Sequence, residues 1–215
     1  TNLIARSPVA TGCAMILVDS HAQNMIAVAP GANHELSLQA VAEACKGNHR
    51  FRLAQLEIPL DCVVEASRHG NLILNPAPAR TLPLELYAGL FAITPNETEA
   101  ELLTGIKPDS NANCQAVSAK FTSWGVQNVV VTLGARGCWF EDKVVPGYKV
   151  DAIDTTAAGD AFNGGLVYAL DQGMNWPEAL RFANAVGALS TTKHGAQESM
   201  PTLHEVNAFL EQHSH

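Results

Sequence analysis

Apolar runs rich in β-branched residues alternate along this chain with segments whose apolar residues recur at helical spacing. Strands are predicted near 13–18, 25–28, 51–56, 72–74, 90–93, 128–132 and 137–140. Helices are predicted near 36–45, 60–67, 97–104, 113–124, 159–172, 176–191 and 202–212. This alternation predicts an α/β fold of three layers, a parallel sheet with helices on both faces. Such sheets bind ligands beyond the carboxyl ends of their strands, so the functional site is expected there.

The composition is that of one globular domain, expected to span 1–215, since no repeat, low-complexity tract or linker interrupts the chain. A net charge of −8 argues against a general nucleic-acid or membrane-surface role, which requires basic patches. No apolar run approaches the roughly 18 residues of a membrane helix. The 5 scattered cysteines favour neither a disulfide framework nor a structural zinc site, and the eight histidines have no metal-ligand spacing. A cytoplasmic protein is expected.

Residues 154–165, Asp-Thr-Thr-Ala-Ala-Gly-Asp-Ala-Phe-Asn-Gly-Gly, constrain the chemistry most. The small residues Ala157, Ala158 and Gly159 leave backbone N–H groups uncovered just before an apolar helical segment. A helix that begins there directs unpaired N–H groups and its positive dipole end forward, which suits phosphate. Asp160 lies in the first turn, beside this anion site. The carboxylate either takes a proton from a hydroxyl while the N–H groups hold a phosphoryl group, or is only an acid favoured by the dipole.

The stretch resembles the signature of the ribokinase-like (phosphofructokinase-B) family of sugar kinases. Further matches occur in family order at 55–57, 75–80, 94–101, 132–137 and 195–197. The resemblance implies an ATP-dependent kinase that phosphorylates the primary (O5) hydroxyl of D-ribose to give ribose 5-phosphate. The N-terminal third of the family pattern is absent, so an N-terminally incomplete domain is expected, with a partial small β lid near 11–30. The family's lid often pairs two subunits, which implies a homodimer for the full-length protein.

The resemblance assigns roles to the residues of the 154–165 stretch and to one further acid. Asp160 becomes the catalytic base and a substrate contact, and the N–H groups of Ala157, Ala158, Gly159 and Asp160 become an anion hole. Glu57 follows an apolar strand, where an acid is unfavourable unless it has a partner. The resemblance implies that Glu57 contacts a hydroxyl of the sugar. The alternative is that Glu57 is a solvated residue at the end of the strand.

Asn96 and Glu99 precede an apolar helix with the spacing Asn-x-x-Glu. The local reading is a capping box, in which each side chain accepts a hydrogen bond from the other residue's backbone N–H. The family reading is that the two hold Mg²⁺, largely through water, together with nucleotide phosphate. Both can hold at once.

A glycine-containing turn follows the strand predicted at 128–132. No P-loop and no Gly-x-Gly-x-x-Gly fingerprint is present, so neither a P-loop NTPase nor a dinucleotide fold is supported. In the family the backbone of this turn approaches ATP, and Asn184 lies by the adenine; alternatively Asn184 is a solvent-facing helical residue. The implied ATP-binding residues are Asn96, Thr132, Leu133, Gly134, Ala135, Arg136, Gly137, Gly159, Asp160 and Asn184.

A monovalent-cation site for K⁺ is also implied by the resemblance. A weakly held cation requires several oxygens, which backbone carbonyls, a hydroxyl and one carboxylate supply. Lys193 would contribute its carbonyl only. The alternative is a polar turn ahead of the last helix. The implied ligands are Asp154, Thr156, Ser190, Lys193, Gly195 and Ser199.

Two other functions stay open at the level of the sequence. The first alternative is a kinase whose acceptor is another pentose, deoxyribose or a nucleoside, although the motifs at 55–57 and 75–80 favour ribose. The second alternative is not an enzyme but an inactive fragment that binds a nucleotide or a cation.

Overall fold

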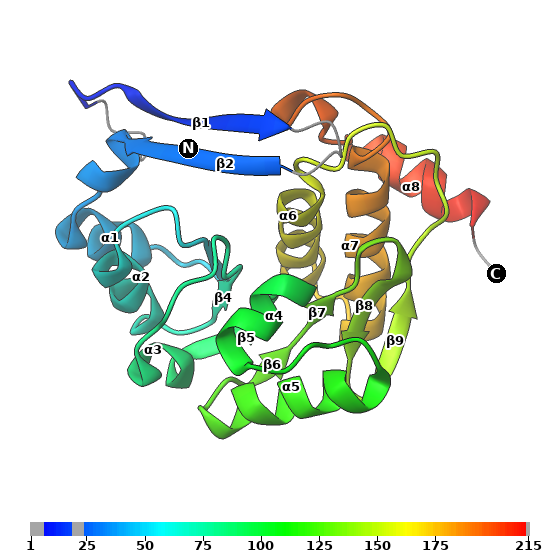
Figure 1. Ribbon diagram of the computed structural model, residues 1–215, viewed down its shortest axis with the longest axis horizontal. Helices are drawn as coiled ribbons and strands as arrows, with labels where there is room; N and C mark the ends of the chain where they lie inside the picture. Colours follow the sequence, from blue (N-terminus) through cyan, green and yellow to red (C-terminus); the bar gives the residue numbers. More distant parts are fainter. Residues whose placement is uncertain (1–6, 19–23, 214–215) are drawn as a thin grey trace.

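The computed structural model describes residues 7–18 and 24–213. A four-stranded parallel sheet lies at its centre in the order β3-β4-β5-β6 (Figure 1). The strands are β3 (Arg52–Ala54), β4 (Leu72–Leu74), β5 (Leu90–Ile93) and β6 (Asn128–Val129). At least one helix connects each strand to the next, as parallel pairing requires.

A three-stranded antiparallel sheet continues the central one, with β7 (Val131–Thr132), β8 (Gly137–Phe140) and β9 (Lys143–Pro146) in that order. Only Val130 separates β6 from β7, and its N–H donates to the carbonyl oxygen of Ile93 at 3.0 Å. The single strand predicted at 128–132 is therefore interrupted where the chain changes its partner from β5 to β8.

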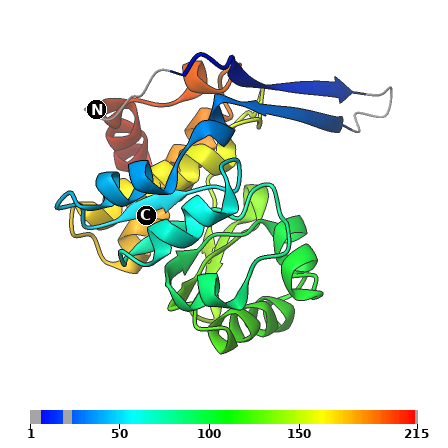
Figure 2. The ribbon, with the colours of Figure 1, turned by 90° about the vertical axis from the view of Figure 1, so that its left-hand side faces the viewer.

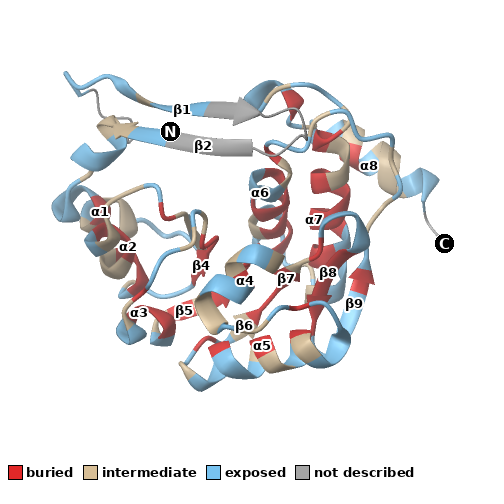
Figure 3. Ribbon diagram, viewed as in Figure 1, coloured by how far each residue is buried: buried red, intermediate tan, exposed pale blue. Residues whose placement is uncertain are grey.

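Helices cover both faces of this sheet. On one face pack α1 (Leu38–Cys45), α2 (Leu60–Ser67), α3 (Leu84–Ala88), α4 (Glu97–Thr104) and α5 (Asn111–Ser123). On the other face pack α6 (Ala158–Asp171), α7 (Trp176–Ser190) and α8 (Leu203–Gln212). The alternation within β4 separates the two cores, since Leu72 and Leu74 join the first core and Ile73 joins the second. Figure 3 shows the buried residues along the inner sides of these layers. The predicted three-layer α/β fold is confirmed.

Hydrogen-bonded caps fix where several helices begin. Asn96, Asn175 and Thr202 each form a capping box with the glutamate three residues later, at the starts of α4, α7 and α8. Ser37 and Ser110 cap α1 and α5. Short 3₁₀ helices lie at Ala32–Glu35, Gly134–Arg136 and Gln197–Ser199. None of the helices in the described ranges has the length and apolarity needed to cross a bilayer.

Strands β1 (Thr11–Val18) and β2 (Asn24–Gly31) form an antiparallel hairpin that is a sheet of its own. Figure 2 shows the hairpin extending away from the layered body. Met15 and Val28 on it are 64% and 52% exposed. The hairpin occupies the segment in which lid strands are predicted.

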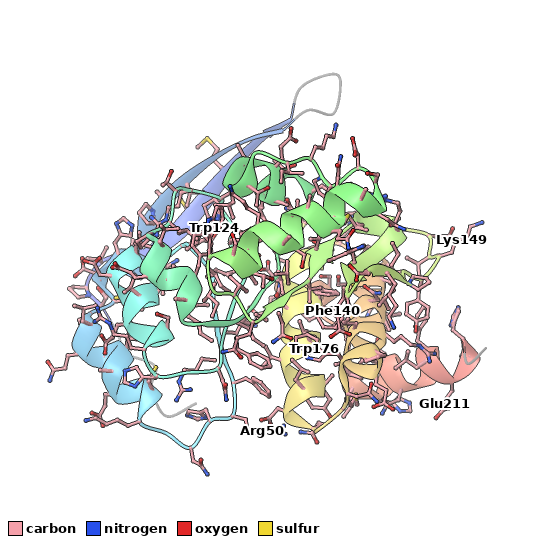
Figure 4. All side chains as sticks on the ribbon, turned by 90° about the horizontal axis from the view of Figure 1, so that it is seen from below. Arg50, Trp124, Phe140, Lys149, Trp176 and Glu211 are labelled. Carbon is pink, nitrogen blue, oxygen red and sulfur yellow. The ribbon has the colours of Figure 1, made fainter. Side chains whose placement is uncertain are left out.

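Aromatic rings join β5 and β8 to the start of α7. Phe140 and Trp176 stack with ring centroids 4.6 Å apart, and Phe91 stacks on the same Trp176 ring at 5.9 Å. Figure 4 shows Phe140 and Trp176 side by side in the view from below. Such pairs hold α7, and the α6 helix that packs along it, at a fixed position on the sheet.

Candidate active site

Two cavities border the first turn of α6. The first has a volume of about 340 Å³, and Asp160 is part of its wall. The second has a volume of about 600 Å³, and Ala158 and Gly159 are part of its wall. A group held in either cavity is therefore adjacent to the same helical turn. The first cavity is lined by Leu53, Ala54, Gln55, Asn75, Asp160 and Asn163.

The first turn of α6 presents free backbone donors. Its N-cap, Ala157, contributes no side-chain cap, and the N–H groups of Gly159 and Asp160 have no hydrogen-bond partner in the described residues. Of the four N–H groups predicted to form an anion hole, that of Ala158 already donates to the carbonyl oxygen of Thr155 at 3.2 Å. A Cβ atom on Gly159 would meet no heavy atom within 4 Å, so the space in front of this turn is open. The turn suits an anion.

Asp160 is held by a residue far away in the sequence. The side-chain amide of Gln55, just beyond the end of β3, donates a short hydrogen bond to Asp160 Oδ1. Desolvation by the surrounding residues raises the pKa of Asp160, and the hydrogen bond from Gln55 opposes that rise. The carboxylate is thus oriented, and it is a stronger base than an ordinary aspartate.

A buried hydrogen-bond chain connects the end of β5 to the same turn. The hydroxyl of Thr94 donates to Asn163 Oδ1 at 2.6 Å, and Asn163 Nδ2 donates to the carbonyl oxygen of Gly159 at 2.9 Å. Thr94 and Asn163 are each only 2% exposed. Buried bonds of this kind hold the Gly159 peptide in one position relative to the sheet.

The second cavity collects most of the residues predicted to bind ATP. Its walls come from the start of α4, the turn after β7, the segment 147–152, and helices α6 and α7. The predicted residues that line it are Asn96, Thr132, Gly134, Ala135, Gly137, Gly159 and Asn184.

Three other predicted ATP-binding residues lie outside this lining. Leu133 is 2% exposed and packs in the core, and Asp160 lines the first cavity. The guanidinium of Arg136 is turned to the start of α4, where it forms a 2.6 Å ion pair with Glu97. The ion pair joins the turn after β7 to α4, and both of these segments border the second cavity.

Asn184 is buried, so the reading of this residue as a solvent-facing helical asparagine is wrong. Its Nδ2 donates to the carbonyl oxygens of Val145 and Pro146 at 3.2 and 3.1 Å. These bonds tie α7 to β9, and the residue also lines the second cavity.

Asn96 and Glu99 form the predicted capping box. Asn96 Oδ1 accepts from the N–H of Glu99 at 2.9 Å, and Glu99 Oε2 accepts from the N–H of Asn96 at 2.8 Å. Desolvation raises the pKa of Glu99, and the negative charge of nearby Asp160 raises it further. Glu99 itself lines neither cavity, whereas Asn96 lines the second and Asp160 the first. A divalent cation near Glu99 and Asp160 would relieve the repulsion between the two carboxylates.

Asp154 organises the segment in which a cation site is predicted. It accepts hydrogen bonds from the hydroxyl and the N–H of Thr156 at 2.5 and 3.0 Å, and from the N–H of Gly195 at 3.0 Å. The Thr156 hydroxyl, followed by the Gly195 N–H, lowers the pKa of Asp154 to about 2. Asp154 therefore stays ionised and fastens the loop that carries Gly195 to the segment before α6.

The other residues of the predicted cation site lie between the end of α7 and the 3₁₀ helix Gln197–Ser199. Ser190 ends α7, and its hydroxyl donates to Gly187, while that of Ser199 donates to Ala196. The ammonium of Lys193 forms a 2.7 Å ion pair with Glu205. The described residues contain no group of three or more His, Cys, Asp or Glu side chains that could hold a metal ion.

Glu57 does not end a strand, contrary to the prediction. β3 ends at Ala54, because the next buried residue, Leu56, turns its N–H to the carbonyl oxygen of Ala77 at 2.9 Å. Glu57 follows in an exposed bend and does not line the first cavity.

Gln55, Asn75 and Asn163 line the first cavity and were assigned no individual role from the sequence, although Gln55 and Asn75 belong to the matched motifs at 55–57 and 75–80. Gln55 and Asn75 are the first residues after β3 and β4. A polar residue directly after a buried strand is the signal that points to them.

The pfkB family carbohydrate kinase profile matches residues 4–203, which is most of the chain. The chain belongs to the pfkB family of carbohydrate kinases. It is 43% identical over 212 residues to the ribokinase of Haemophilus influenzae, covering 94% of this chain and 69% of that protein. The crystal structure of a ribokinase from Thermotoga maritima is similar, with a TM-score of 0.86 and 39% identity over 96% of this chain and 72% of that one. The Arabidopsis thaliana ribokinase complexed with ribose and ATP has a TM-score of 0.82 and 29% identity, over 95% and 70% of the two chains.

Proposed function

We propose that this protein is an ATP-dependent kinase that transfers the γ-phosphoryl group of ATP to the primary (O5) hydroxyl of D-ribose, giving ribose 5-phosphate and ADP. The observation that carries the proposal is the position of Asp160, in a helical turn that borders both cavities. ATP occupies the larger cavity, and the sugar occupies the smaller one. The similarity to the ribose- and ATP-bound ribokinase supports this assignment of the two ligands.

Asp160 is the base in this proposal. Its carboxylate takes the proton from the O5 hydroxyl while O5 bonds to the γ-phosphorus and the bond from that phosphorus to the bridging β,γ oxygen breaks. ADP leaves with the electron pair. The N–H groups of Gly159 and Asp160, with Ala157 and Ala158 in the same turn, stabilise the charge on the transferred group. Glu57, in the bend after β3, contacts a hydroxyl of the sugar.

The turn after β7 and Asn184 bind the nucleotide, and Asn96 with Glu99 hold Mg²⁺ beside its phosphates. A divalent ion supplies charge neutralisation of the phosphates. The K⁺ site consists of oxygens from Asp154, Thr156, Ser190, Lys193, Gly195 and Ser199. The protein acts in the cytoplasm, residues 1–215 belong to one domain, and the β1–β2 hairpin is part of a lid through which the full-length protein forms a homodimer.

The function is tested by measuring ADP release with a panel of acceptors: D-ribose, 2-deoxy-D-ribose, D-arabinose and inosine. D-Ribose is expected to give the highest kcat/KM. A higher value for 2-deoxy-D-ribose or inosine would assign a different acceptor. ADP release with none of them, despite ATP binding, would favour a nucleotide-binding protein without kinase activity.

Glu99→Gln is expected to raise the Mg²⁺ concentration for half-maximal rate roughly tenfold, with KM for the sugar little changed. Gln keeps an oxygen that accepts from the Asn96 N–H, so the capping box is retained and only the charge is lost. Glu101→Gln, on the exposed side of the same helix, is the matched control. An unchanged Mg²⁺ dependence would restrict Glu99 to its capping role.

Potassium is expected to activate several-fold, and sodium poorly, at matched ionic strength. An ordered 190–199 loop would hold the start of α6 in position, so the effect should appear in kcat or in KM for ribose. Asp154→Asn should remove the difference between the two ions. Equal turnover in K⁺ and Na⁺ by the unaltered protein would contradict the proposed cation site.

A further inference from the structure

Asn75 differs from every other buried polar residue in the described ranges. The eight such residues are Ser67, Asn75, Thr94, Asn163, Asn184, Ser190, Thr191 and Ser199. Seven of their side chains form hydrogen bonds within the protein. The side chain of Asn75 forms none, although the residue is only 6% exposed. Polar side chains in such positions are nearly always paired within the protein, so the unpaired amide of Asn75 requires a reason.

The backbone of Asn75 is fixed, so the unpaired amide is not the result of a loose segment. Its N–H donates to the carbonyl oxygen of Ala54 at 2.9 Å, directly after β4. The preceding carbonyl, that of Leu74, accepts from the N–H of Thr94 at 3.0 Å. The residue therefore sits between the ends of β3 and β5, on the rigid part of the sheet.

The amide of Asn75 remains accessible from the smaller cavity. The residue lines this cavity together with Gln55, Asp160 and Asn163. The buried side-chain atoms that lack both a partner and solvent contact belong to Arg52 and Trp139 among the described residues, so those of Asn75 still reach open space. A carboxamide offers two donors and one acceptor, a set that pairs with hydroxyl groups.

The charge of the cavity indicates what kind of ligand it takes. Asp160 is the one ionisable residue in its described lining, and no lysine or arginine lines it. An anionic sugar phosphate would meet a carboxylate without a compensating cation. A neutral polyol meets amides from Gln55, Asn75 and Asn163 instead.

We propose that Asn75 is a sugar-binding residue, which donates and accepts hydrogen bonds with a hydroxyl of the acceptor and selects neutral polyols over sugar phosphates. The inference rests on the proposed function, since it places the acceptor in the cavity beside Asp160. The amide has no hydrogen-bond partner among the described residues, and a hydroxyl of the bound polyol becomes its partner.

The test compares Asn75→Ala and Asn75→Asp with the unaltered full-length protein. Asn75→Ala is expected to raise KM for ribose roughly 3- to 10-fold, the loss of one or two hydrogen bonds, with KM for ATP unchanged. Its Tm should be unchanged, because the Asn75 side chain forms no hydrogen bond within the described protein and its amide reaches the open cavity. Asn75→Asp has the same size but lacks the N–H donors, and it should also raise KM for ribose. The control is Asn111→Ala. Asn111 is an exposed asparagine on α5, and its side chain forms no hydrogen bond in the described chain.

Each outcome separates the inference from the proposed function. If ribose is phosphorylated and both Asn75 variants keep KM for ribose within twofold, the inference is wrong and the proposed function stands. If Asn75→Ala lowers Tm while KM for ribose stays unchanged, Asn75 is structural and the inference is again wrong. If the unaltered protein phosphorylates a different polyol, the proposed function fails, and the same comparison with that polyol decides the role of Asn75.

Discussion

Asp160→Asn is expected to lower kcat for sugar phosphorylation about 10²- to 10⁴-fold, while KM for ATP stays close to that of the unaltered protein. The asparagine still accepts a hydrogen bond from Gln55 through Oδ1, and the helical turn with its free N–H groups is unchanged. Only the proton acceptor is lost. Steady-state kinetics, together with calorimetry using a non-hydrolysable ATP analogue, measure the two effects separately.

Asp171→Asn is the matched control, because Asp171 is an exposed carboxylate at the other end of α6. It should keep kcat within twofold. Full activity of Asp160→Asn would remove Asp160 as the base. The pH profile gives a second readout: desolvation raises the pKa of Asp160, so the rate of the unaltered protein should fall on acidification through a pKa above that of an ordinary aspartate.

Gly137→Ala is expected to destabilise the protein by about 2–5 kcal/mol, the largest stability effect anticipated for a single methyl group. Gly137 has a φ of 96°, and a Cβ atom there would lie 2.2 Å from the carbonyl oxygen of Val145. The next-nearest atoms, the backbone nitrogen of Gly147 at 2.4 Å and the carbonyl carbon of Pro146 at 2.6 Å, are also backbone, so none of the three can move aside cheaply. The free energy of unfolding in urea measures the loss.

Gly134→Ala is the matched comparison in the same turn. Gly134 also has a positive φ, of 56°, but a Cβ atom there meets no heavy atom within 4 Å. Only the backbone conformation is penalised, at roughly 1–2 kcal/mol. Equal losses for the two variants would show that the close approach of β9 to Gly137 does not matter for stability.

The layered fold follows from local patterns, and the sequence predicts it well. Capping boxes such as Asn175 with Glu178 mark helix starts, and the apolar run 72–74 marks a buried strand. The sequence does not predict β9, because Lys143 and Val144 are both exposed and the strand ends in proline, so no buried apolar run marks it. The turn before it places Glu141 and Asp142 at positive φ, which neither residue type signals. The helix α3 is also missed, since five residues are too few for a periodic pattern.

Local pattern alone predicts the site only where its residues lie close together in the sequence, and the distant residues of the second cavity were predicted from the family resemblance. The 154–165 stretch identifies Asp160 and its N–H groups because helix start and acid are adjacent. Gln55 lies 105 residues away from Asp160, and the sheet alone brings them together. The unpaired state of Asn75 is likewise a property of packing, which no local pattern encodes. At Glu57 the local pattern predicted too much. The continuous apolar pattern suggested a strand that reaches Glu57, whereas β3 contains only three residues.

The most direct test of the proposed reaction is NMR of the product formed from D-ribose and ATP with Mg²⁺ and K⁺. Phosphorus-31 and carbon-13 spectra identify the carbon that carries the new phosphate. The proposal predicts phosphate on C5 in amounts equal to the ADP formed, and no sugar phosphate from 5-deoxy-D-ribose, which lacks the acceptor hydroxyl. Phosphate on another carbon, or release of inorganic phosphate without a sugar phosphate, would contradict the transfer from ATP to O5 beside Asp160.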